Sequence, residues 1–261
     1  VKAFKPALLR RMVTVPFYPI SDDILRLIIR LQLGKIKNRI ADNHGAQFWI
    51  HYFRCGIGLV NLSFFSHLAA GLNAHGIDVA VPGYDLCPAV SIAEIIGQMR
   101  AASRELARFG RPLVVSGHSA GGHLAACMMA TDWRALDPTA PPDLIPTGSA
   151  ISGVFDLTGL VNTEMNADFK LDEASARASS PLFWPAPKGR VLDIVVGADE
   201  LPEFIRLSHV MADSWGAAGV ETRYEEVPGT HHFNVVAPLA DPTSTMTARV
   251  AELCELTRAA G

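Results

Sequence analysis

The sequence lacks any apolar run that approaches the roughly 18 residues needed to cross a membrane. It also lacks a secretory signal, because Lys2, Lys5, Arg10 and Arg11 interrupt the apolar residues near its beginning. Hydrophobic residues make up 49% of the chain and the net charge is only −3, which excludes an intrinsically disordered protein. Glycine and proline, at 21 and 17 of 261 residues, are too few for a collagen-like or low-complexity chain. We therefore expect a globular cytoplasmic protein with one large domain.

The cysteines are few and far apart in the sequence. Cys55, Cys87, Cys127 and Cys254 form no pair with the spacing of a zinc or redox site, and no cluster of His, Cys and Asp suggests a metal. Buried free thiols in a reducing compartment are the simplest interpretation. We expect no metal and no cofactor.

Charge is divided unevenly along the chain. Residues 1–60, the basic head, hold 10 Lys and Arg against 3 Asp and Glu, whereas residues 61–261 hold 13 against 23. Within the head, Ser21 could begin an amphipathic helix that runs to about Ile40. Such a helix can lie on a membrane surface, or pack over a domain as a cap, which we favour. No motif supports a nucleic-acid partner, and we expect none.

From about Leu62 onward, short β-rich runs alternate with helical patterns. The patterns predict strands at 77–82, 112–116, 147–151, 191–196 and 221–227, and helices at 91–109, 120–130, 202–218 and 243–259. This alternation predicts an α/β protein with a mostly parallel sheet and helices on both faces. We expect an atypical segment over 1–60 and a catalytic domain over 61–261, with its chemistry at the carboxyl ends of the strands.

One motif in this alternation carries a nucleophile. Gly117–Gly121 reads G-H-S-A-G and lies between a predicted strand and a predicted helix, the context that a nucleophilic serine of this kind requires. Glycines allow the sharp turn that would project Ser119 from the sheet. The helix that follows would direct its amide groups at the site, so the backbone N–H of Ala120 is a candidate oxyanion donor.

A serine hydroxyl needs a base and an acid, which follow it in the order acid, then histidine, in this type of fold. Asp199 and Glu200 follow one predicted strand, and His231 and His232 follow the next. The spacing alone leaves both pairs open. The histidines that flank the serine, at positions 118 and 123, are expected to shape its loop.

Several stretches, in order, resemble the kynurenine formamidase (arylformamidase) branch of the esterase/lipase-like α/β-hydrolases. They are FSHLAAGLNAHGIDVAVPGYDLCP (65–88), SIAEIIGQMRAA (91–102), GHSAGGHLAA (117–126), ASSPLFW (178–184), VVGADELPEF (195–204) and HHFNVVAPLADPTS (231–244). The resemblance implies an α/β-hydrolase fold and a cofactor-free serine hydrolase of small amides or esters. Its implied substrate is N-formyl-L-kynurenine, which gives kynurenine and formate, with a general carboxylesterase as the nearest alternative. A homodimer is left open.

The resemblance also selects between the paired candidates. In the family the acid precedes an x-P/A-E-F-like run, which corresponds to Glu200 rather than Asp199. The family histidine immediately precedes a phenylalanine, which corresponds to His232 rather than His231. The implied triad is therefore Ser119, His232 and Glu200.

The likeness ends where the basic head ends. The family has an H-G-G-Y-W-like loop whose glycines complete the oxyanion hole, but residues 51–58 of this chain read HYFRCGIG. Either the head has diverged, with Gly56 or Gly58 as the second donor, or residues 1 to about 62 derive from a shifted reading frame or a fusion. A hydrolase-fold protein with impaired or no catalysis is therefore a further alternative.

Overall fold

The computed structural model describes residues 48–52, 66–110 and 113–260. The chain divides into two compact units, Val1–His44 and Gly45–Gly261, and the described residues belong to the second unit. The helix predicted over 21–40 lies outside the described residues, as do Cys55 and Gly56. The predicted boundary at residue 60 stays a prediction, although the strand Phe48–Tyr52 lies before it.

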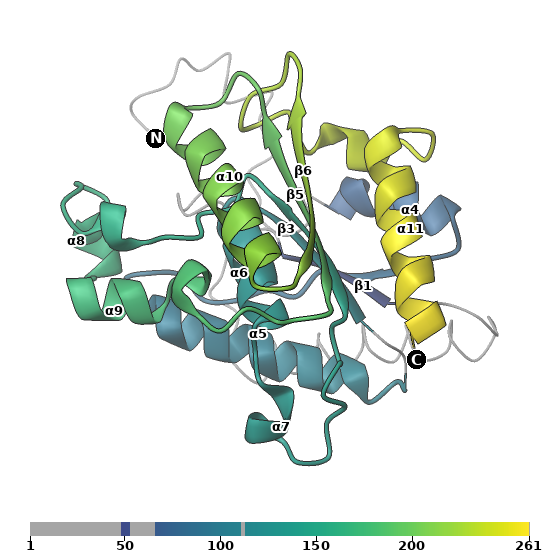
Figure 1. Cartoon of the computed structure of the whole chain (residues 1–261), viewed down its shortest axis with the longest axis horizontal. Coiled ribbons are helices and arrows are strands. Elements are labelled where there is room, and N and C mark those ends of the chain that lie inside the picture. Colours follow the sequence, from purple (N-terminus) through teal and green to yellow (C-terminus); the bar gives the residue numbers. More distant parts are fainter. Residues whose placement is uncertain (1–47, 53–65, 111–112, 261) are drawn as a thin grey trace, which may run out of the picture. The chain divides into compact units, whose positions relative to one another are not determined.

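A six-stranded parallel sheet forms the centre of the described part of the chain (Figure 1). Its strands are β1 (Phe48–Tyr52), β2 (Asp78–Ala80), β3 (Leu113–His118), β4 (Thr147–Ile151), β5 (Val191–Gly197) and β6 (Glu221–Val227). They lie in the order β2-β1-β3-β4-β5-β6, and each neighbouring pair is parallel. The predicted α/β class is confirmed, and parallel pairing brings the carboxyl ends of all the strands to one edge.

The described helices are α4 (Ala69–Ala74), α5 (Ile92–Ala107), α6 (Ala120–Met129), α7 (Trp133–Leu136), α8 (Asn166–Phe169), α9 (Glu173–Ala178), α10 (Pro202–Ala217) and α11 (Thr245–Ala260). The four longest of them lie where the sequence predicts helices, and the four shorter ones are not predicted. Ser91 and Glu94 form the capping box expected at the start of α5, so each side chain satisfies a backbone amide of the first turn. Figure 1 shows α4 and α11 together on one side of the sheet and α5, α6 and α10 on the other.

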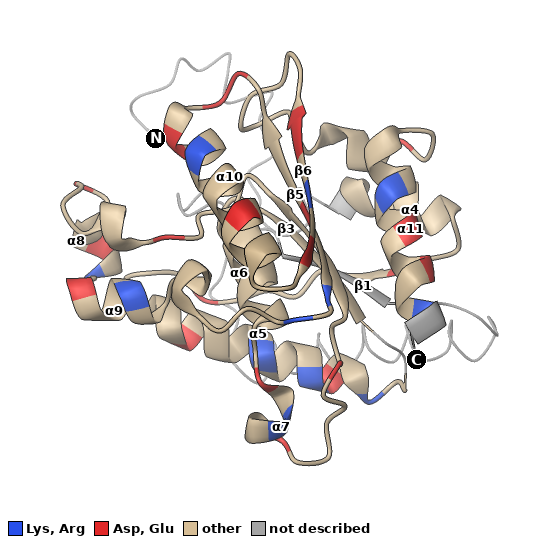
Figure 2. Ribbon diagram, viewed as in Figure 1, with Lys and Arg blue, Asp and Glu red and all other residues tan. Residues whose placement is uncertain are grey.

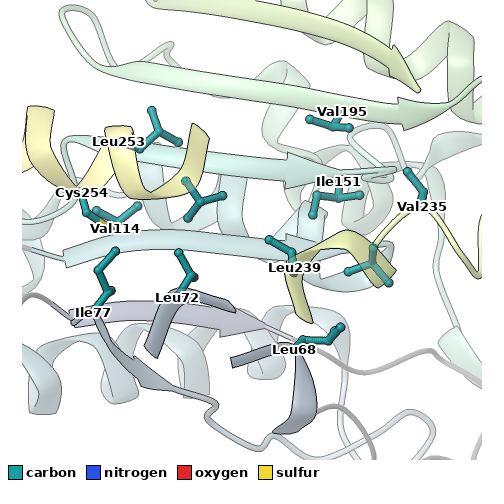
Figure 3. Close-up of a cluster of buried hydrophobic side chains, with 12 residues drawn as sticks. Leu68, Leu72, Ile77, Val114, Ile151, Val195, Val235, Leu239, Leu253 and Cys254 are labelled. Carbon is teal, nitrogen blue, oxygen red and sulfur yellow. The ribbon is translucent and has the colours of Figure 1, made fainter. Parts of the chain in front are cut away.

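One cluster of buried apolar side chains fills the space between the sheet and the α4–α11 side (Figure 3). Val114, Ile151 and Val195 come from β3, β4 and β5, and they belong to the same buried cluster as Leu72 of α4 and Leu253 of α11. Strands β3 and β4 are buried along their whole length, as expected for central strands with helices on both faces. This packing fixes the strand ends that carry the candidate site.

Most charged residues of the described unit lie on its helices and on β6. Figure 2 shows both signs interspersed on the helices and on β6, while β3 and β4 contain neither sign. Within the described residues, none of the helices has the length and apolar character that a membrane span requires. Cys127 and Cys254 are buried free thiols as predicted, but Cys87 is only half-buried, so the prediction of burial is wrong there.

Candidate active site

Ser119 lies on a sharp turn between β3 and α6. Its φ is 57°, a left-handed value that residues with a Cβ rarely adopt. The turn needs small neighbours: a Cβ on Gly117 would lie 2.2 Å from the carbonyl oxygen of Gly121, and one on Gly122 would lie 2.8 Å from Cα of Gly153. The strand–turn–helix geometry that the motif predicts is therefore present, and it leaves Ser119 half-buried at the carboxyl edge of the sheet.

Two side chains from later loops lie in line with this serine. Nε2 of His232 is 3.1 Å from Oγ of Ser119, and Nδ1 of the same ring is 2.6 Å from Oε2 of Glu200. Glu200 follows β5, and His232 lies in the loop after β6, so the three residues come from the connections that follow β3, β5 and β6. The Glu200 side chain has no exposed surface, whereas His232 keeps 17% of its own exposed. The arrangement can pass a proton from a serine hydroxyl to an imidazole that a buried carboxylate orients.

The second carboxylate oxygen of Glu200 also accepts hydrogen bonds from the protein. Oε1 accepts hydrogen bonds from Oγ of Ser152, at 2.5 Å, and from the backbone N–H of Gly197, at 2.9 Å. Burial acts to raise the pKa of Glu200, but the hydrogen bonds from His232, Ser152 and Gly197 outweigh it and hold the pKa below its ordinary value. The carboxylate is therefore ionised at neutral pH.

Aromatic rings enclose His232. The ring of His118 lies 4.5 Å from it and the ring of Phe204 lies 4.3 Å from it, measured between centroids. Burial, followed by the nearby charge of His232, lowers the pKa of His118 to about 4, so this neighbour is neutral at neutral pH. His123 is buried in α6, where its Nε2 lies 3.2 Å from Sγ of Cys127, and burial lowers its pKa to about 4. The ring that contacts Oγ of Ser119 is that of His232.

The other members of the two candidate pairs point elsewhere. Asp199 is exposed, and its backbone N–H donates to the carbonyl oxygen of Thr230. His231 is also exposed, and its Nδ1 accepts a 3.2 Å hydrogen bond from the backbone N–H of Phe233. The structure therefore brings Glu200 and His232 to Ser119 and uses their sequence neighbours in the loops.

Of the two expected oxyanion donors, only Ala120 is among the described residues. Ala120 is the first residue of α6, so its N–H lies at the positive end of the helix and has no acceptor within the helix. The predicted second donor, Gly56, lies outside the described residues.

Sequence reasoning missed the residues that contact Glu200 and His232 of the candidate triad. Ser152, the Gly197 amide and Phe204 had no predicted role. One signal was available for Ser152, because it is a small polar residue directly after a predicted strand, where the sheet places its chemistry.

This fold, with a serine on the β3–α6 turn, defines an α/β-hydrolase. Among solved structures, a candidate thioesterase of Silicibacter sp. TM1040 is 33% identical with a TM-score of 0.67, over 80% of this chain and 78% of that one. An esterase of Pyrobaculum calidifontis, 17% identical with a TM-score of 0.67 over 91% of this chain and 99% of that one, shares the fold.

Curated proteins narrow the class further. Kynurenine formamidase of Salmo salar is 31% identical over 183 residues, and that of Danio rerio is 27% identical over 188 residues. The alignments cover 67% and 69% of this chain but only 61% and 63% of those proteins. A comparison with protein-family models finds no match. The chain belongs to the kynurenine formamidase-like branch of the α/β-hydrolase superfamily, and it spans about three fifths of the length of these relatives.

A third curated relative is of another kind. The AAA+ ATPase ClpV1 of Pseudomonas aeruginosa is 56% identical over 48 residues, which is 18% of this chain and 5% of that protein. This short stretch is more similar to its relative than any stretch reported above for the hydrolases.

Proposed function

We propose that this chain is a serine hydrolase that cleaves a small amide or ester, with N-formyl-L-kynurenine as the leading substrate. The observation that carries the proposal is the hydrogen-bonded line from Ser119 through His232 to Glu200. The likeness to proteins named kynurenine formamidase supports the choice of substrate.

In the proposed first step, Oγ of Ser119 attacks the formyl carbon while Nε2 of His232 takes the hydroxyl proton. Glu200 holds the ring by its other nitrogen and stabilises the imidazolium that forms. The amide of Ala120 donates to the developing oxyanion. When the tetrahedral intermediate collapses, the C–N bond breaks, His232 gives its proton to the arylamine nitrogen, and kynurenine leaves a formylated Ser119.

Water completes the reaction. His232 takes a proton from a water molecule, whose oxygen attacks the formyl carbon of the ester. Collapse of this second intermediate returns the proton to Oγ of Ser119 and releases formic acid, which ionises to formate in water. The chemistry balances with water alone, so the proposal calls for no cofactor.

Esters and thioesters are the alternative substrates of the same site. An arylamine leaves more readily than an alkylamine, so a site for formanilides would also accept activated aryl esters. The Silicibacter relative described as a candidate thioesterase favours a test with an acyl thioester as well. Impaired catalysis is the third alternative, because removal of one oxyanion donor lowers the rate roughly 10²–10³-fold.

The test compares the parent protein with Ser119→Ala on p-nitrophenyl acetate, N-formyl-L-kynurenine and an acetyl thioester. We expect turnover of at least one substrate by the parent and a loss of about 10⁴-fold or more in the variant. Turnover of esters alone would replace the formamidase assignment with a carboxylesterase. Equal rates for the two proteins would overturn the serine mechanism.

For the domain organisation, we propose that the part of the basic head that precedes β1 has a different origin from the hydrolase. A 48-residue likeness to a protein of another class, ClpV1, supports a fusion of two coding sequences. Sequencing of the encoding DNA tests this, because an H-G-G-Y/W loop in another reading frame would indicate a shifted frame instead.

The proposed substrate is a small molecule, and the homodimer stays a prediction that sedimentation velocity would test.

A further inference from the structure

Ser152 follows the last residue of β4 and has an unusual backbone conformation. Its φ is 49°, in the left-handed region, and its side chain is fully buried. The backbone N–H of Ser152 donates a 2.7 Å hydrogen bond to the carbonyl oxygen of Val195 on β5. A strained conformation of a residue other than glycine persists only where the surroundings hold it, and it is often found at functional sites.

The Ser152 hydroxyl points to the acid of the proposed triad. It donates to Oε1 of Glu200 at 2.5 Å, and the N–H of Gly197 donates to the same oxygen at 2.9 Å. Oε2 is thereby left for Nδ1 of His232, which lies 2.6 Å away. Two fixed donors on one oxygen set the rotation of the carboxylate, and this rotation determines where the imidazole can bind.

We propose that Ser152 is a positioning residue whose hydroxyl holds the Glu200 carboxylate in the orientation that binds His232. The inference rests on the proposed function and deepens it, because it names the group that aligns the acid from behind. A hydroxyl donor to a buried carboxylate also favours its charged form, in line with the direction of the Glu200 pKa.

The choice of residue supports this role. Glycine would adopt a φ of 49° without strain but has no donor, and alanine has the strain without the donor. Serine is the smallest residue that brings a hydroxyl to Oε1. The hydroxyl therefore explains why a strained residue occupies the end of β4.

The test uses Ser152→Ala and Ser152→Gly, with Ser103→Ala as the matched control. Ser103 is equally buried, but its hydroxyl donates to the carbonyl oxygen of Met99 within α5. For p-nitrophenyl acetate we expect both Ser152 variants to lose about tenfold in kcat with KM unchanged, which corresponds to about 1.4 kcal/mol. The acid limb of the pH profile should move to higher pH, because a Glu200 carboxylate with one donor fewer keeps its own proton to higher pH.

Two further measurements keep the proposal separate from general damage to the fold. The double variant Ser152→Ala/Glu200→Ala should have the same kcat as Glu200→Ala alone, because the residue through which Ser152 acts is absent from both. In acid unfolding, which needs no turnover, the midpoint pH of both Ser152 variants should lie above that of Ser103→Ala. An acid limb that coincides with that of the parent, or equal unfolding midpoints, would overturn the proposal.

These outcomes are distinguishable from failure of the proposed function. If Ser119→Ala is inactive but the Ser152 variants keep the parent profile, only the positioning role is wrong. If Ser119→Ala keeps the parent rate, the proposed function itself fails, and the acid-unfolding comparison still decides whether Ser152 stabilises the Glu200 carboxylate.

Discussion

One buried carboxylate lies within strand β5 and another lies just after it, and the two bind different partners. Asp193, within the strand, accepts two hydrogen bonds from the Arg249 guanidinium of α11, at 2.6 and 2.9 Å, and lies 3.7 Å from Arg223. Glu200, just after the strand, binds the imidazole of His232 and the hydroxyl of Ser152. Counted over backbone and side chain together, Asp193 is 2% exposed and Glu200 is 8% exposed, so burial does not distinguish the two residues.

The partner determines what each carboxylate can do. A guanidinium keeps its proton throughout the working pH range, and Asp193 raises the pKa of Arg249 further, so this pair is a fixed link between the sheet and α11. An imidazole can accept a proton at one ring nitrogen and later donate it, so the Glu200 pair can take part in proton transfer. One strand thus carries a structural ion pair and a candidate catalytic pair.

Replacement of the carboxylate by an amide at Glu200 should have the largest effect on activity. We expect Glu200→Gln to lower kcat/KM for p-nitrophenyl acetate by roughly 10³–10⁴-fold, because an amide cannot stabilise the imidazolium. The free energy of unfolding should change by only about 1 kcal/mol. Asp199→Asn is the matched control, and its rate should stay within about twofold of the parent; a large loss there would move the acid to Asp199.

The same change at Asp193 should act on stability instead. Asp193→Asn leaves Arg249 without its buried partner, so we expect a loss of about 3 kcal/mol in the free energy of unfolding, measured by urea titration. The kcat of the folded protein should be close to that of the parent. Glu252→Gln removes the exposed partner of the same Arg249 and should have a much smaller effect. A variant that is stable but inactive would contradict the structural role.

Acid pH should remove the stabilisation that the Glu200 carboxylate gains from its hydrogen bonds. The folded-state pKa of Glu200 lies below its ordinary value of 4.5, so the stabilisation from its hydrogen bonds is complete above pH 4.5 and is lost as the pH falls through the folded-state pKa. The difference in unfolding free energy between the parent and Glu200→Gln should therefore narrow as the pH falls from 6 to 3. A difference that stays constant over this range would mean that the Glu200 carboxylate does not gain from folding.

The smallest effect is expected from the histidine beside the proposed base. His231→Ala removes an exposed ring that accepts a loop hydrogen bond and lies beside Phe233, so kcat/KM should stay within about twofold of the parent. His232→Ala, measured under the same conditions, should lose activity to the extent of Ser119→Ala. Reversed results for the two histidines would place the base at His231.

Local patterns were sufficient for most of the fold. Alternating strand and helix periods predicted the parallel sheet, and the glycines around Ser119 predicted the turn, because both depend on residues close in sequence. The spacing could not choose between Asp199 and Glu200, since both follow the same strand. That choice came from the family resemblance, and the side-chain geometry agrees with it.

Contacts between distant residues could not be predicted. Ser152 and Glu200 are 48 residues apart, and Asp193 and Arg249 are 56 apart. These pairs form only because parallel strands and α11 bring their ends together. No local pattern in the sequence encodes such a contact, so the partners of the candidate triad could be identified only from the folded chain.

The most direct test of the central claim is covalent labelling of the nucleophile. The parent, Ser119→Ala and Asp193→Asn are treated with a fluorophosphonate, and the site of any adduct is located by mass spectrometry. The line from Ser119 to Glu200 predicts one adduct per chain, on Ser119, in the parent and in folded Asp193→Asn, and none in Ser119→Ala. An adduct on another residue, or no labelling of the folded parent, would contradict it.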